Sequence, residues 1–147
     1  MRAVVQRVSQ ASVSVGAKIV GEIRLGLLVF VGIREGDNDT HAAKLAKRIA
    51  NLRVFPDNDG KMNLSLRDVS GEMLVVSQFT LYGDTTSGNR PSYSTAAKPE
   101  AAKLLYEMFV QLCKDEGVTV ATGVFQAHME VALINDGPVT LICHSES

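Results

Sequence analysis

The chain up to Ile33 consists almost entirely of short runs rich in β-branched side chains. Glycine and polar residues interrupt these runs at short intervals, which is typical of antiparallel strands joined by tight turns. The predicted strands are Ala3–Val8, Ala11–Val15, Ile19–Arg24 and Leu27–Ile33. The fold therefore begins with a sheet, and any helices must pack against it.

Two helices are predicted after this region, each with a recognisable start. The segment Gly36–Asp39 is rich in capping residues, and apolar residues follow it at helical spacing. A second helix begins at Pro99, which suits the first helical position, and stops at Gly117. The apolar stripe expected to be buried on it is Ala101, Leu104, Leu105, Met108, Phe109 and Leu112.

Later strands are predicted at Met73–Phe79, Val118–Thr122, Met129–Ile134 and Val139–Cys143. The stretch from Tyr82 to Lys98 is a long loop, and long ordered loops are usually functional. The sequence therefore predicts an α+β fold, with curved, mostly antiparallel sheets in a barrel-like or sandwich-like arrangement and two helices packed on one side.

Composition predicts a single domain spanning residues 1–147, because 147 residues that are 46% hydrophobic suffice for one compact core. The net charge of −1 argues against a protein that grips long stretches of nucleic acid, since phosphate contacts need Lys or Arg. The isolated Cys113 and Cys143 indicate buried, reduced thiols and a cytoplasmic protein. The longest apolar stretch, Leu25–Ile33, is too short to span a membrane.

Two segments are not explained by packing alone. One is Ser77-Gln78-Phe79-Thr80-Leu81, at the end of an apolar run, and the other is Asn135-Asp136-Gly137-Pro138-Val139-Thr140. Gly137 can take backbone angles closed to other residues, while Pro138 lacks an N–H and can adopt a cis peptide. Taken singly, either segment reads as ordinary strand or turn chemistry, because Asn58-Asp59-Gly60 is also a turn.

Together, and in this order, the two segments resemble the signatures of the D-aminoacyl-tRNA deacylases, also called the D-tyrosyl-tRNA deacylase family. The segments Gln6–Val8, Gly60–Leu64 and Gly88–Tyr93 are similar to that family as well, although Tyr93 stands where the family often has Phe. The resemblance implies a homodimeric enzyme that hydrolyses the ester bond of D-aminoacyl-tRNA and of glycyl-tRNA. It also implies that no metal or organic cofactor takes part.

The first segment is the expected catalytic element. Ser77, Gln78, Phe79 and Thr80 would hold the ester and the 3′-terminal adenosine, with main-chain N–H groups around Phe79 and Thr80 directed at the carbonyl oxygen. Thr80 is the only hydroxyl considered as a covalent nucleophile, but no base is spaced to activate it. We therefore favour attack by water, assisted by the neighbouring ribose hydroxyl. The alternative is that Ser77 and Thr80 merely end a strand.

In the family, the Gly-Pro segment is a cis peptide of one subunit that enters the pocket of its partner, which assigns Gly137 and Pro138 to substrate binding. Arg7 matches the family's early arginine and would clamp this loop, although it also reads as a strand-edge charge. Phe125 and Met129 resemble residues that line the adenosine pocket, although by composition each reads as core.

Other hydrolytic devices are missing from the sequence. The histidines His41, His128 and His144 lack metal-ligand spacing, and there is no Gly-x-Ser-x-Gly segment or phosphate-binding glycine loop. Two rival functions stay open, a non-catalytic module that binds RNA 3′ ends and a generic amino-acid esterase. Turnover of aminoacyl-tRNA separates the first rival from the deacylase, and action on amino-acid esters without tRNA identifies the second.

Overall fold

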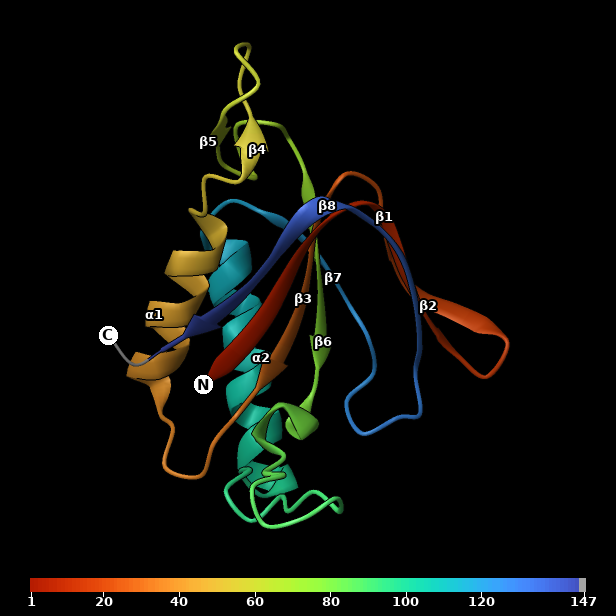
Figure 1. Cartoon of the computed structure of the whole chain (residues 1–147), viewed down its shortest axis with the longest axis vertical. Coiled ribbons are helices and arrows are strands. Elements are labelled where there is room, and N and C mark those ends of the chain that lie inside the picture. Colours follow the sequence, from red (N-terminus) through yellow and green to blue (C-terminus); the bar gives the residue numbers. More distant parts are fainter. Residues whose placement is uncertain (146–147) are drawn as a thin grey trace.

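The fold is a strongly curved sheet with two helices packed on one of its faces, as Figure 1 shows for this computed structural model, which describes residues 1–145. The predicted α+β class is confirmed. The elements in chain order are β1 (Arg2–Val15), β2 (Lys18–Ile23), β3 (Gly26–Gly32), α1 (Asp39–Ala50), β4 (Phe55–Pro56), β5 (Met62–Leu64), β6 (Glu72–Ser77), the 3₁₀ turn η1 (Phe79–Tyr82), α2 (Pro99–Asp115), β7 (Thr119–Thr122) and β8 (Glu130–His144). None of the helices in the described range is long and apolar enough to cross a membrane.

The main sheet has the strand order β2-β1-β3-β6-β7, and β8 pairs with β1 off this path. Strand β1 is antiparallel to β2, β3 and β8, whereas β6 is parallel to both β3 and β7. The sheet curves so strongly that β2 comes close to β7. At the point of approach, a Cβ atom on Gly21 would lie only 2.3 Å from the carbonyl oxygen of Thr122. The result is a nearly closed barrel, with the β4–β5 hairpin projecting beyond it (Figure 1).

Two predicted breaks in the strands are wrong. Ser9 and Gln10 do not end a strand, because β1 continues through them while its pairing with β8 shifts register on both sides of Val8. The Asn-Asp-Gly-Pro segment likewise lies inside β8, between the Val8–Asn135 and Gln6–Thr140 pairs. The irregular part of β1 around Val8 therefore lies opposite the irregular part of β8 that contains Asn135–Pro138.

The larger hydrophobic core lies between the helices and the sheet, and it includes Leu45, Ile49, Phe55 and Phe109. Helix α1 begins at its predicted start signal, with Asn38 as the N-cap, and ends at Ala50. The predicted stripe of α2 is partly wrong, since Leu104 is 71% exposed. The buried residues of this helix are Ala102, Leu105, Tyr106, Phe109, Val110 and Cys113.

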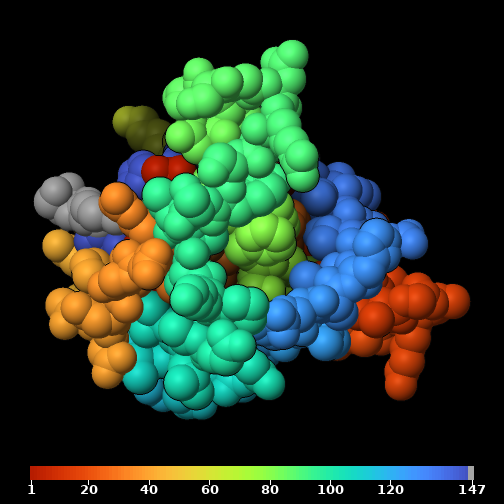
Figure 2. Space-filling model, turned by 90° about the horizontal axis from the view of Figure 1, so that it is seen from below, coloured from red at the N-terminus to blue at the C-terminus, as the bar shows by residue number. Residues whose placement is uncertain are grey.

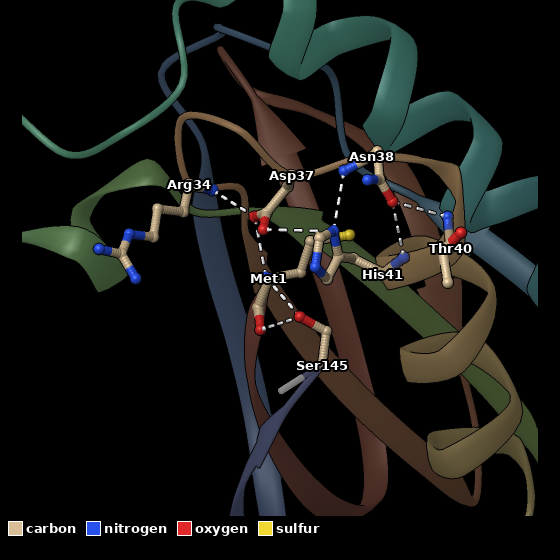
Figure 3. Close-up of polar contacts among 7 residues, drawn as sticks. All are labelled: Met1, Arg34, Asp37, Asn38, Thr40, His41 and Ser145. Atoms are coloured by element: carbon tan, nitrogen blue, oxygen red, sulfur yellow. Dashed lines mark hydrogen bonds and ion pairs between the residues drawn. The ribbon is translucent and has the colours of Figure 1, made fainter. Parts of the chain in front are cut away.

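The amino group of Met1 is buried in a polar cluster at the start of β1 (Figure 3). It lies 2.8 Å from a carboxylate oxygen of Asp37, whose side chain is only 5% exposed, and it donates a hydrogen bond to Ser145 Oγ at 2.7 Å. Asp37 also accepts a hydrogen bond from the backbone N–H of Arg34 at 2.7 Å. This cluster fixes the turn between β3 and α1 against both ends of the described chain.

Candidate active site

The first signature segment lies where β6 ends. The strand stops at Ser77, the backbone N–H of Gln78 still donates to Val31 O at 2.8 Å, and the chain then forms the 3₁₀ turn η1. The predicted strand Met73–Phe79 therefore ends two residues early. The first N–H groups of such a turn, here those of Phe79 and Thr80, have no carbonyl within the turn to bond.

The side chains of this segment contact one another and a neighbouring loop. The Gln78 amide donates a hydrogen bond to the Thr80 hydroxyl. The Phe79 ring is 58% exposed and lies edge-on to the Tyr93 ring, with centroids 5.2 Å apart. Among the described residues, Thr80 has no hydrogen bond to a histidine or carboxylate side chain.

The long loop that carries Tyr93 is ordered against the end of β3. The backbone N–H of Ala97 donates to Ile33 O, and that of Glu35 donates to Thr95 O, both at 2.9 Å. Asp84 lies near the start of the loop, and hydrogen bonds from the Thr86 hydroxyl and backbone N–H hold the pKa of its carboxyl below the usual range. Tyr93 had no predicted role, although it belongs to the segment Gly88–Tyr93 that resembles the family.

Phe125 and Met129 lie on the connection between β7 and β8, which approaches the end of β6. The backbone N–H of Gly123 donates to Val75 O at 3.1 Å, and the hydroxyl of Tyr106 donates to the same oxygen at 3.1 Å. The Phe125 ring packs against Tyr106, at 5.7 Å between centroids. Figure 2 shows this connection, in lighter blue, beside the yellow-green end of β6.

The side chains of Phe125 and Met129 nevertheless pack against two different hydrophobic cores. Phe125 packs against the core beneath the helices, whereas Met129 packs against the cluster inside the barrel. Both are partly buried, so each keeps some surface available to a ligand. Burial raises the pKa of the neighbouring Tyr106 to about 12, and its phenol therefore stays neutral as a hydrogen-bond donor.

The second signature segment forms an irregular loop within β8, and its Gly137–Pro138 peptide is cis, as the resemblance implied. Arg7 lies against it and donates from Nε to the main-chain oxygen of Asp136 at 3.0 Å. The Asn135 amide donates to the main-chain oxygens of Arg7 and Val139, at 2.9 and 3.2 Å. The loop is thus held through its backbone by side chains from both strands.

One chain does not bring the two signature segments together. Arg7 pairs with Leu27 and, through it, with Met73, whereas Ser77 pairs with Val31 and, through it, with Ala3. The two levels are four residues apart along the strands, which corresponds to about 13 Å. The loop with Gly137 and Pro138 is therefore displaced along the sheet from the turn that follows Ser77.

A further residue near the site carried no signal in the sequence. Arg2 donates from Nη1 to the main-chain oxygen of Leu81 at 2.9 Å, and its guanidinium lies over the Tyr82 ring, 4.8 Å from the centroid. From the sequence alone, an arginine at the start of a strand is expected to be an exposed, solvated charge. Its contact with η1 depends on a pairing of distant segments.

The histidines take other positions. His41 belongs to the α1 cap, where its Nδ1 accepts a hydrogen bond from the backbone N–H of Asn38 at 3.0 Å, and His128 is exposed on the connection before β8. Within residues 1–145, no group of three or more His, Cys, Asp or Glu side chains is placed to hold a metal ion.

Comparison with solved structures supports the fold. A structure titled "c-Myc DNA Unwinding Element Binding Protein" superposes with a TM-score of 0.93 and 38% identity, over 100% of both chains. A second, titled "Structural Analysis of a probable eukaryotic D-amino acid tRNA deacylase", gives a TM-score of 0.82 over 97% of both chains. At 16% identity, this second likeness shows a shared fold alone.

Sequence comparison identifies the family. The chain is 58% identical over 146 residues to a D-aminoacyl-tRNA deacylase of Fervidobacterium nodosum, covering 99% of this chain and 98% of that protein. It is 57% identical over 145 residues to one of Thermotoga petrophila, covering 99% and 97%. The model of the D-Tyr-tRNA(Tyr) deacylase family matches residues 4–144, and the chain therefore belongs to this family.

Proposed function

We propose that this chain is a D-aminoacyl-tRNA deacylase, a hydrolase that cleaves the ester between a D-amino acid and the 3′ end of tRNA. Relatives with that name share more than half of its residues over nearly their whole length. The observation that carries the proposal is the 3₁₀ turn Phe79–Tyr82 after β6, whose first N–H groups have no acceptor within the turn. In the proposal, the N–H groups of Phe79 and Thr80 bind the carbonyl oxygen. Residues 1–147 act as one deacylase domain.

The chemistry needs little from side chains. An aminoacyl ester is already activated, and its negative charge in the transition state is stabilised by the N–H groups of Phe79 and Thr80. Gln78 orients the Thr80 hydroxyl through their hydrogen bond, while Ser77 ends the strand that fixes the turn. Water attacks the ester with help from the neighbouring ribose hydroxyl, and the amino acid and tRNA are released. No metal or organic cofactor takes part.

The working unit is a homodimer in which each site is shared. Within one chain, the Gly137–Pro138 loop is displaced along the sheet from the turn after Ser77, which supports a dimer in which a second copy supplies the loop. Two large apolar side chains flank the loop in β8, Ile134 at 53% and Ile142 at 65% exposure. Exposed apolar surface of this kind is typical of an interface, and two-fold dimers are the commonest assemblies.

The remaining contacts are with the end of the tRNA. The 3′-terminal adenosine binds beside Phe125 and Met129, which border the end of β6 and keep partly exposed surfaces. Contact limited to this tip agrees with a net charge of −1. Cys113 and Cys143 are free and buried, which agrees with the proposed cytoplasmic location.

The direct test is deacylation. Purified protein is incubated with D-tyrosyl-tRNA, L-tyrosyl-tRNA and D-tyrosine ethyl ester, each with and without a chelator. We expect release of the amino acid from the D-aminoacyl-tRNA alone, at the same rate in both buffers. Protection of the D-ester would identify an RNA-end-binding module, and equal cleavage of the small ester would identify a generic esterase.

The shared site has a separate test by subunit complementation. One variant, Gly137→Val, blocks the loop, and another, Thr80→Pro, removes a main-chain N–H of the turn. Homodimers of either variant should be inactive. Mixed dimers should regain about half of the activity per dimer, because one of their two sites combines an intact turn with an intact loop. No recovery in mixed dimers that are shown to form would overturn the shared site.

A second candidate function has one observation in its favour. The similar structure at 38% identity is titled as a protein that binds a DNA unwinding element. The present chain has 15 basic and 16 acidic residues, a balance that disfavours affinity for long duplexes. A duplex-binding assay at moderate salt decides this question independently of the deacylation result.

A further inference from the structure

The end of η1 is held by a residue that the proposed chemistry does not use. Arg2 donates from Nη1 to the main-chain oxygen of Leu81 at 2.9 Å, and its guanidinium carbon lies 4.8 Å from the centroid of the Tyr82 ring. Leu81 and Tyr82 are the last two residues of the turn, whose first two residues are Phe79 and Thr80. Arg2 therefore contacts the turn at the end opposite to the proposed oxyanion donors.

The turn needs such an anchor because its own structure is weak. A 3₁₀ turn is short and its hydrogen bonds are poorly aligned, and the carbonyl groups at its end lack partners within it. The Phe79 ring is mostly exposed and contributes little burial. The direction of the N–H groups at the start of the turn thus depends on how firmly Leu81 and Tyr82 are held.

Gly32 provides a second support directly beside Arg2. The two residues are register partners in β1 and β3. A Cβ atom on Gly32 would lie 2.9 Å from Gln78 O and 3.1 Å from the Cβ of Leu81, so the turn rests on the bare backbone of β3. The turn is therefore fixed by close packing on one strand and by the arginine of the next.

We propose that Arg2 is a positioning residue for ester hydrolysis, and that it acts by fixing the Leu81 carbonyl and the Tyr82 ring so that the N–H groups of Phe79 and Thr80 point at the ester. The proposal rests on the proposed deacylase function. Arg2 does not touch the reacting atoms. Its contribution is made in the transition state, where the orientation of the donors matters most.

The surroundings of the Arg2 Nε atom distinguish the proposed positioning role from a contribution to the stability of the fold. The Nε atom of Arg2 is buried and has no hydrogen-bond partner among residues 1–145. A buried donor without a partner is destabilising, and this cost opposes the gain from the Leu81 contact. Replacing Arg2 with an apolar side chain of similar length should therefore change stability much less than catalysis.

The test compares three variants in the full-length protein. Arg2→Met keeps an unbranched apolar side chain but removes the charge and all donors, while Arg2→Lys keeps the charge and a donor. Arg67→Met is the matched control, because Arg67 also donates from Nη1 to a main-chain oxygen, that of Glu116 at 2.6 Å, but lies away from the turn. We measure kcat and KM for D-tyrosyl-tRNA and the midpoint of thermal unfolding.

Arg2→Met should lower kcat at least about tenfold while KM stays within about twofold, since misplaced catalytic groups cost rate more than binding. Arg2→Lys should recover part of kcat, and Arg67→Met should match the unsubstituted protein. An unchanged kcat in Arg2→Met would overturn the proposal. A rise in KM alone would also overturn it, because Arg2 would then bind the tRNA directly.

A readout without turnover keeps this proposal separate from the deacylase function. The amide proton and nitrogen shifts of Phe79 and Thr80 are measured by NMR in Arg2→Met and Arg67→Met. The proposal requires both amides to shift in the first variant alone, and unchanged shifts would overturn it. If the unsubstituted protein does not hydrolyse D-tyrosyl-tRNA, the deacylase function fails, while these shifts still decide whether Arg2 positions the turn.

Discussion

Arg7 contacts Asp136 through two different acceptors. Its Nε donates to the main-chain oxygen of Asp136 at 3.0 Å and also lies 3.2 Å from the carboxylate. A third bond runs from Arg7 Nη1 to the main-chain oxygen of Val54 at 2.6 Å. The arginine thereby joins the Gly137–Pro138 loop to the base of the β4–β5 hairpin through backbone atoms.

This geometry predicts that the charge on Asp136 matters less than the backbone contact. Arg7→Met should lower kcat about tenfold or more, because the loop loses its anchor and, in the proposed dimer, the partner's site loses a fixed wall. Asp136→Asn, the control, keeps the main-chain oxygen and should stay within about twofold of the unsubstituted protein. The measurement is deacylation of D-tyrosyl-tRNA. Equal losses in the two variants would show that the ion pair is the important contact.

A second prediction concerns the Thr80 hydroxyl, which accepts a hydrogen bond from the Gln78 amide and, among residues 1–145, has no hydrogen bond to a histidine or carboxylate side chain. Thr80→Ala should keep activity within about tenfold, whereas a substrate without the ribose hydroxyl next to the ester should react about a hundredfold more slowly or worse. Both are measured as single-turnover rates. A trapped acyl group on Thr80, or an inactive but folded Thr80→Ala protein, would instead indicate covalent catalysis.

A third prediction concerns the buried amino group of Met1 (Figure 3). Asp37→Asn removes the carboxylate charge that this ammonium group contacts at 2.8 Å, and it should lower the free energy of unfolding by about 3 kcal/mol. The control Asp39→Asn alters an exposed carboxylate in the first turn of α1 and should cost less than about 1 kcal/mol. Chemical denaturation measures both. Equal effects would rule out a special role for the buried pair.

The sequence predicted the parts of the fold that depend on local chemistry. Helix α1 starts at its capping residue Asn38, and α2 starts at Pro99, because a cap and a first-turn proline act within a few residues. The break predicted at Ser9–Gln10 is wrong, since β8 supplies a pairing partner from the far end of the chain. Leu104 is exposed because the neighbours of a helix, and not its spacing alone, decide which face is buried.

The same distinction holds for the site. The segments around Thr80 and Gly137 were found through their resemblance to a family, and the cis peptide agrees with it. The contact from Arg2 to Leu81 was not predicted, because the two residues are 79 positions apart and meet only through the β1–β3–β6 pairing. The distance between the two signature segments along the sheet could not be predicted either, because it depends on the register in which the strands pair.

A fourth prediction follows from the burial of Cys113, which raises the pKa of its thiol from 9.0 to about 12. Between these values, the unfolded chain loses a proton that the folded chain keeps, so the stability present below pH 9 is lost as the pH rises. The loss is up to about 1.4 kcal/mol per pH unit. Denaturation from about pH 8 to about pH 11 should show a shallower decline in Cys113→Ala. Parallel declines would contradict the assigned cause.

The last prediction concerns stereochemistry. In the proposed shared site, the main-chain atoms of Gly137 and Pro138 would lie against the α-carbon of the substrate. Asn135 and Arg7 hold that backbone in place, so it cannot rotate away as a side chain could. A filter of this kind works by excluding an L side chain, and it makes no demand on the chemistry of a D side chain.

D-aminoacyl-tRNAs with different side chains should therefore be hydrolysed at similar rates, and glycyl-tRNA should also be hydrolysed, because glycine has no side chain to exclude. L-alanyl-tRNA should be spared, since a single β-carbon suffices for the clash and displaces the ester from the N–H groups of Phe79 and Thr80. Initial rates with D-alanyl-, D-tyrosyl-, L-alanyl- and glycyl-tRNA test this directly. Cleavage of L-alanyl-tRNA as fast as its D counterpart, or a glycyl-tRNA that resists enzyme sufficient to clear D-alanyl-tRNA, would show that a side-chain pocket, and not the backbone, selects the substrate.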